Sequence, residues 1–227
     1  MVGILFALLI SIGIPVSLFI YAILKKQIWP FVLGIVAFVG SQIVIRLPIL
    51  QFLGENSVTY SMFSAKNPIL FAIIIAFTAG IMEELARFIL MRYAMKKRTW
   101  QSGFIFGAGH GGIEAVLLVG LGAFVMLFSV TGEQYSGDFL IGGIERLFAM
   151  LLHIGLSLLV LQSVVQKRYI YVVVAIFIHG FVNSLVGIYP QFLPPNMALI
   201  AIEVTLAFVA LGLFVYSLFL KRKGVLQ

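Results

Sequence analysis

The fold of this chain is decided by residues 68–93, which read PILFAIIIAFTAGIMEELARFILMRY. A helix rises about 1.5 Å per residue, so roughly 20 apolar residues cross the hydrocarbon core of a bilayer. This stretch is long enough to cross, yet it contains Glu83, Glu84 and Arg87. Ionisable residues are costly in hydrocarbon and mark a functional site by default. We therefore expect a membrane-spanning helix that carries part of such a site.

The whole chain has the composition of a membrane protein. Its 227 residues are 62% hydrophobic and only 10% charged, and its mean hydropathy is +1.16. These values lie outside the range of ordinary soluble domains. Seven apolar segments are long enough to span, so we expect one all-α membrane domain, residues 1–227, built as a bundle of about seven transmembrane helices. The expected spans are residues 3–24, 30–53, 68–93, 101–130, 139–165, 169–188 and 196–220.

The basic residues lie at every second connection between the expected spans. The net charge of +7 does not indicate a nucleic-acid binder, because these residues form short clusters between apolar runs instead of a stripe on one face. By the positive-inside rule, the N-terminus faces out and the C-terminus faces in. We expect a multi-pass protein of the cell membrane, in a bacterium the plasma membrane. The clusters are Lys25-Lys26, Lys96-Lys97-Arg98, Lys167-Arg168 and Lys221-Arg222-Lys223.

Four of the expected helices carry ionisable residues at a similar depth. Counted from the cytoplasmic ends at ~1.5 Å per residue, Glu84, His110, His153 and His179 lie about 14–20 Å into the membrane. Polar residues three or four positions apart also share one face of a helix. We expect these faces to meet near the middle of the membrane. The residues that share a face are Glu83 and Glu84 with Arg87, His110 with Glu114, and His179 with Asn183.

These residue types suit a metal site. The chain has no cysteine, so a metal would be held by histidine, carboxylate or water. A catalytic zinc ion uses three such protein ligands and keeps a water, whose pKa falls to ~7. Glycines such as Gly107 and Gly109 beside His110 would let separate helices approach one ion. A glutamate could then act as general base, with Asn183 hydrogen-bonding an oxyanion and Arg87 orienting a glutamate.

Elimination narrows the chemistry. The only aspartate is Asp138, in an expected outer loop, so an intramembrane aspartyl dyad is excluded. The sequence contains no H-E-x-x-H motif and no G-x-S-x-G motif, which argues against those hydrolase patterns. A retinal-binding protein would need a lysine within the last helix, and Lys221 lies at its exit.

Three motifs resemble those of the CAAX-protease and bacteriocin-processing (CPBP, or Abi) superfamily. Glu83 to Arg87 resembles its E-E-x-x-x-R signature in a form one residue shorter, Phe106 to His110 matches F-x-x-x-H, and His179 to Asn183 matches H-x-x-x-N. The H-G-G-x-E sequence that ends at Glu114, and the additional His153, make the chain most similar to the YhfC family of intramembrane metalloproteases. The resemblance covers roughly residues 68–188, which we take as the motif-bearing catalytic core.

The resemblance implies a glutamate-dependent intramembrane endopeptidase that cleaves a membrane-associated peptide or protein. It also implies that Glu83 is the base. Neighbouring helical residues point about 100° apart, so we expect only one of the two glutamates to face the reacting water. The other glutamate, Glu84, is expected to be held by Arg87 or a neighbouring helix. The expected catalytic residues are Glu83, Glu84, Arg87 and Asn183, and the expected zinc ligands are His110, His153, His179 and Glu114.

Two other classes of function stay open from the sequence. The superfamily is similar to the gamma-secretase scaffold subunit APH-1, and a buried His/Glu cluster can serve assembly alone. Glu/His relays also mark proton- or ion-coupled transporters. A transporter often shows repeated halves with broken helices, which this sequence lacks. No oligomeric state is predicted.

Overall fold

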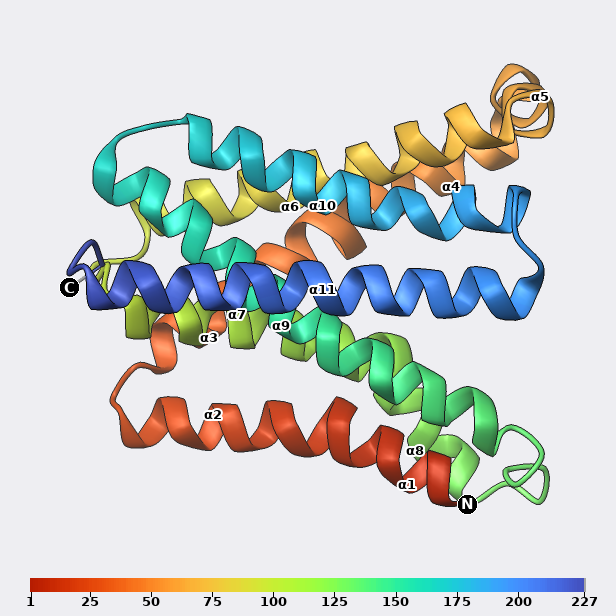
Figure 1. Ribbon diagram of the computed structural model, residues 1–227, viewed down its shortest axis with the longest axis horizontal. Helices are drawn as coiled ribbons and strands as arrows, with labels where there is room; N and C mark the ends of the chain where they lie inside the picture. Colours follow the sequence, from red (N-terminus) through yellow and green to blue (C-terminus); the bar gives the residue numbers. More distant parts are fainter. Residues whose placement is uncertain (227) are drawn as a thin grey trace.

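The computed structural model describes residues 1–226, and within this range it contains helices and no strands. Seven helical rods are long and apolar enough to cross a membrane, and they run back and forth along one direction (Figure 1). The expected all-α, seven-span bundle is therefore confirmed. The rods are Val2–Leu24, Ile28–Asn56, Pro68–Tyr93, Trp100–Leu127, Ser136–Gln166, Ile170–Gln191 and Pro195–Arg222.

Three rods are interrupted by wider π-helical turns, which the sequence did not predict. Such turns are rare and frequently occur at functional sites. The first rod is α1 (Val2–Leu8), η1 (Leu9–Gly13) and α2 (Ile14–Leu24); the second is α3 (Ile28–Phe38), η2 (Val39–Arg46) and α4 (Leu47–Asn56); the fourth is α7 (Trp100–Ala115), η3 (Val116–Gly120) and α8 (Leu121–Leu127). The others are α6 (Pro68–Tyr93), α9 (Ser136–Gln166), α10 (Ile170–Ile188) with the short 3₁₀ turn η4 (Tyr189–Gln191), and α11 (Pro195–Arg222).

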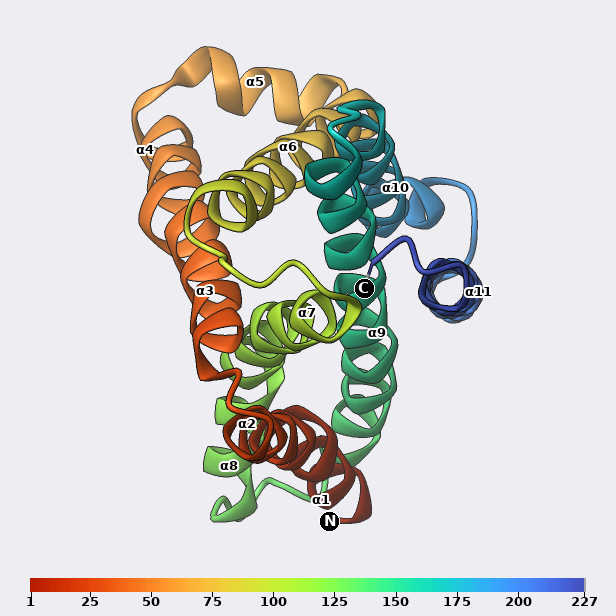
Figure 2. The same ribbon diagram turned by 90° about the vertical axis from the view of Figure 1, so that its left-hand side faces the viewer.

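The connections gather at two ends of the bundle. The turns after α2, α6 and α9 lie with the C-terminus at one end, which we call the basic end (Figure 1). The opposite end, which we call the α5 end, holds the N-terminus and α5 (Val58–Lys66). Helix α5 crosses the ends of the rods where the sequence predicted only a loop (Figure 2). The basic clusters thus share one end, while the side of the membrane that it faces stays a prediction.

Helix α9 is the centre of the packing. It contacts α1, α6, α7, α10 and α11, and Leu156, Leu158 and Leu161 on it are fully buried. Figure 2 shows α7 between α3 and α9, with α11 on the outside against α9. Lipid tails are as apolar as leucine, so close packing rather than burial from water holds such helices together.

Two glycines of α7 allow its neighbours to come close. A Cβ atom at Gly109 would lie 2.1 Å from the Phe31 carbonyl oxygen of α3, and one at Gly107 would lie 2.6 Å from Ile154 Cα of α9. No side chain fits at either distance. The two glycines therefore allow α3 and α9 to pack closely on opposite sides of the segment that carries His110. The sequence led us to expect such a close approach.

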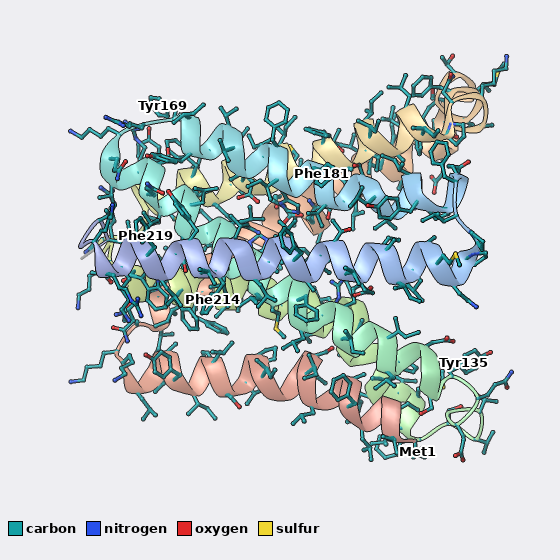
Figure 3. All side chains as sticks on the ribbon, in the orientation of Figure 1. Met1, Tyr135, Tyr169, Phe181, Phe214 and Phe219 are labelled. Atoms are coloured by element: carbon teal, nitrogen blue, oxygen red, sulfur yellow. The ribbon has the colours of Figure 1, made fainter. Side chains whose placement is uncertain are left out.

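The outer surface of the bundle suits a lipid bilayer. Large apolar side chains such as Phe181 on α10 and Phe219 on α11 are exposed along the rods (Figure 3). Exposed tyrosines lie near the two ends, with Tyr169 at the basic end and Tyr135 at the α5 end (Figure 3). Tyrosine is enriched where a protein meets the membrane–water interface. The chain is thus a multi-pass membrane protein.

Candidate metal centre

The two adjacent glutamates of α6 have different closest partners. The Glu83 carboxylate lies 2.8 Å from His110 Nε2 through Oε2 and accepts a hydrogen bond of 2.8 Å from Gln42 Nε2 through Oε1. Glu84 Oε1 instead lies 2.8 Å from Arg87 Nη1 and 2.6 Å from His179 Nδ1. Because successive helical residues point about 100° apart, the two carboxylates face different closest partners. They share only longer contacts, since Arg87 Nη2 lies 3.5 Å and His179 Nε2 lies 3.9 Å from Glu83.

Arg87 connects α6 to two histidines. Its side chain is fully buried, with Nε 3.4 Å from His110 Nδ1 and Nη2 2.6 Å from His153 Nδ1. A guanidinium group can only donate hydrogen bonds, so both Nδ1 atoms accept. The Nε2 atoms of the two rings therefore carry the hydrogens, and they face carboxylates: His110 faces Glu83, and His153 contacts Glu114.

Four side chains from three rods form a cluster with the chemistry of a metal site. One nitrogen or carboxylate oxygen from each of Glu83, His110, Glu114 and His153 lies within 4.8 Å of all the others. Ligands bound at about 2.1 Å to a tetrahedral zinc ion lie roughly 3.4 Å apart, so donors within 4.8 Å of one another would move closer together on binding one. Imidazole and carboxylate are also the ligand types that zinc accepts. The donor set therefore fits a divalent metal, which would replace the Nε2 hydrogens of the two rings.

The structure thus brings together three of the four expected ligands, His110, His153 and Glu114, with Glu83 as the fourth member. His179 lies beside this cluster. Its Nδ1 faces Glu84, as described above, while its Nε2 is 3.9 Å from Glu83 Oε1. The His153 ring centre is 5.0 Å from that of His110 and 5.4 Å from that of His179, so all three rings lie together. The shared depth of the three histidines, expected from residue counting, is matched by these contacts.

Two residues of the site have partners that sequence reasoning missed. Arg146 on α9 donates a hydrogen bond of 2.7 Å from Nη1 to Glu114 Oε1. Gln42 in η2 donates to Glu83, as given above, and is buried. Both residues stand out as polar side chains within apolar spans, and that signal could have marked them. The sequence did not indicate which carboxylate each would meet.

A cleft of about 690 Å³ leads to the cluster. It runs between η2, α6 and α10, and its lining includes Ser64 of α5 and Gln191 of η4 at the α5 end. Glu83, Glu114 and Asn183 line its inner part. A smaller cavity of about 80 Å³ shares these three residues and continues to His153 and His179. Asn183, which the sequence placed in the site, thus lies where both cavities meet.

Comparison with known proteins extends the similarity beyond these motifs. The sequence matches the family described as "YhfC intramembrane metalloprotease" over residues 6–137 and 129–204. It is also 34% identical over 190 residues to a Bacillus subtilis (strain 168) protein described as "Uncharacterized membrane protein YhfC", covering 71% of this chain and 72% of that protein. No solved structure matches. The match reaches past residues 68–188 into the first two rods, which include Gln42.

Proposed function

Because the chain belongs to the YhfC intramembrane metalloprotease family, we propose that it is a glutamate-dependent zinc endopeptidase of a bacterial plasma membrane. The substrate is a membrane-associated peptide or protein, cleaved in or near the bilayer. The single observation that carries this proposal is the convergence of Glu83, His110, Glu114 and His153 where the cleft ends.

Three of these side chains are assigned to the zinc ion. His110 and His153 would bind it through Nε2, and Glu114 would bind it through its carboxylate, which Arg146 holds from the other side. Three protein ligands are the number found in catalytic zinc sites, where a fourth position stays open. A bound zinc ion supplies a water that is acidic enough to act as a nucleophile at neutral pH. The sequence led us to expect His179 as a zinc ligand. We instead assign it the role of positioning Glu84.

Glu83 is assigned the role of general base. Its carboxylate lines the cleft, whereas Glu84 is 0% exposed and is bound by Arg87 and His179. Glu83 would take a proton from the attacking water as the new carbon–oxygen bond forms, and would return it to the amine as the carbon–nitrogen bond breaks. Asn183, which lines the same cleft, would donate a hydrogen bond from its amide to the developing oxyanion.

The cleft indicates the kind of segment that it would accept. Its walls include Phe71, Ile75 and Val186, and its volume lies within the roughly 300–1,000 Å³ common for ligand sites. Apolar walls favour an apolar peptide. Ser64 and Gln191 also line the cleft, at the α5 end of the bundle. Their position favours entry of the substrate segment from that end.

The proposal is tested with the purified protein in phosphatidylglycerol-containing vesicles, together with a set of internally quenched peptides rich in leucine and alanine. We expect the wild type to cleave at least one peptide, a zinc chelator to stop cleavage, and added zinc to restore it. Glu83→Gln should be inactive with an unchanged melting temperature. Failure to cleave any peptide, or full activity in Glu83→Gln, would contradict the proposal.

A further inference from the structure

We infer that Gln42 is a positioning residue for Glu83 and that Arg46 in turn fixes Gln42; this assignment rests on the proposed role of Glu83 as base. Gln42 lies in η2, outside the motif-bearing residues 68–188. It is 5% exposed, and its Nε2 donates a hydrogen bond of 2.8 Å to Glu83 Oε1. A buried amide with a charged acceptor makes one of the stronger classes of hydrogen bond.

The two carboxylate oxygens of Glu83 have different partners. Gln42 binds Oε1 and His110 faces Oε2, each at 2.8 Å. Zinc bound at His110 Nε2 would replace the hydrogen that faces Oε2, so the hydrogen bond from Gln42 to Oε1 is the one that would stay in the metal-loaded protein. Gln42 therefore holds Oε1 and leaves Oε2 directed toward His110 Nε2, the atom proposed to bind zinc, so Oε2 is the oxygen that would receive the proton.

Arg46 determines which way the Gln42 amide points. Its Nη1 donates a hydrogen bond of 2.9 Å to Gln42 Oε1. A guanidinium group only donates, and an ionised carboxylate only accepts. The amide oxygen must then face Arg46 and the amide nitrogen must face Glu83. Without the guanidinium, a flipped amide would turn its oxygen toward the Glu83 carboxylate and repel it.

Arg46 is itself anchored to the helix that carries Glu83. Its Nε donates to Thr78 Oγ1 at 3.0 Å, and its Nη2 donates to the Ile75 carbonyl oxygen at 2.8 Å. Both acceptors lie on α6, one to two turns before Glu83. Arg46, Gln42 and Glu83 also line the same cleft. The relay therefore runs along the wall that a bound substrate would contact.

Four variants test this relay in the vesicle assay. Gln42→Met keeps the length of the side chain and removes the donor, and we expect kcat to fall about 10- to 100-fold, the usual cost of losing an outer hydrogen-bond partner. KM should change less than kcat, because Gln42 acts on the chemical step through Glu83, although it also lines the cleft. Arg46→Met should lower kcat less, and Arg46→Lys, which keeps a donor, should recover part of that loss. Ser41→Ala is the matched control, because Ser41 is buried in η2 to the same extent but its hydroxyl donates only to backbone carbonyls of α3 in the same rod.

A thermal double-mutant cycle tests the contact without any need for activity. The melting temperatures of Gln42→Met, Glu83→Met and the double variant should be non-additive, since either change alone removes the same hydrogen bond. Additive melting temperatures, or a kcat for Gln42→Met within about twofold of the wild type, would overturn the inference. An inactive wild type would contradict the proposed function, and the thermal cycle would then decide the Gln42–Glu83 contact by itself.

Discussion

Arg87 on α6 lies 2.6 Å from His153 on α9, measured from Nη2 to Nδ1. The same guanidinium group reaches His110 on α7 and both glutamates of its own helix. One buried cation thus joins three rods at the proposed centre. Because it donates to the Nδ1 atoms, it leaves the Nε2 atoms of both histidines directed at carboxylates.

Removal of Arg87 should destabilise the bundle. In Arg87→Met, the fully buried Glu84 carboxylate loses its guanidinium partner, and breaking a buried pair in this way costs roughly 3–5 kcal/mol. We expect a clearly lower melting temperature in detergent. Arg92→Met on the same helix is the control, because Arg92 bonds to Tyr169 at the surface and its loss should change little. Equal melting temperatures for the two variants would mean that Glu84 is not charged in the folded protein.

The two glutamates should respond differently to the same substitution. Glu83→Gln should abolish hydrolysis while the fold stays intact, because glutamine keeps the shape and loses the base. Glu84→Gln should lower the melting temperature as well as activity, since Arg87 and His179 both lose a charged partner. Activity and thermal unfolding are measured on both variants. A stable but inactive Glu84→Gln, next to an active Glu83→Gln, would reverse the assignment.

The close helix crossing at α7 predicts a strong effect of one added methyl group. Gly109→Ala would place a Cβ atom 2.1 Å from the Phe31 carbonyl oxygen, which forces α3 away and costs roughly 1–3 kcal/mol. Gly212→Ala in α11 is the matched control, because an added Cβ there meets no atom within 4 Å among the described residues. Melting temperatures should fall for the first variant and hold for the second. Equal values would mean that the two helices do not cross so closely.

Charge asymmetry predicts the orientation of the bundle independently of the site. The basic end should face the cytoplasm, which puts the mouth of the cleft on the outside. Reporter fusions at each connection measure this directly, and one reversed internal loop would disprove the topology. Fusions after Lys26, Arg98, Arg168 and Lys223 should report cytoplasm, and fusions near Ser57, Gln134 and Gln191 should report the outside.

The sequence predicted the rods well because hydropathy and loop charge depend on composition alone. It also predicted which helices meet at the site. His110, His153 and His179 lie at similar distances from the helix ends, and those ends can be located by counting residues. Partners between helices were harder to predict. Arg146 and Gln42 were visible as polar residues in apolar spans, but their contacts with Glu114 and Glu83 depend on how each helix is rotated.

The π-helical turns explain part of that difficulty. A wider turn changes the rotation of every residue after it, and η2 carries both Gln42 and Arg46. Arg46 stands directly before Leu47-Pro48, and the structure shows its guanidinium bonded to Gln42, Thr78 and the Ile75 carbonyl. Regular helical counting cannot locate such a turn. The short helix α5 was missed for a different reason, because its nine residues are too few to show a clear periodic pattern.

The metal content of the purified protein tests the central claim most directly. Plasma emission analysis after mild purification should find about one equivalent of zinc per chain in the wild type, as expected for a single site with three protein ligands. The double variant His110→Ala/His153→Ala should contain almost none, while Ser41→Ala should keep the metal. A folded wild-type protein without a divalent metal at neutral pH would contradict the metalloprotease account and favour a non-proteolytic scaffold.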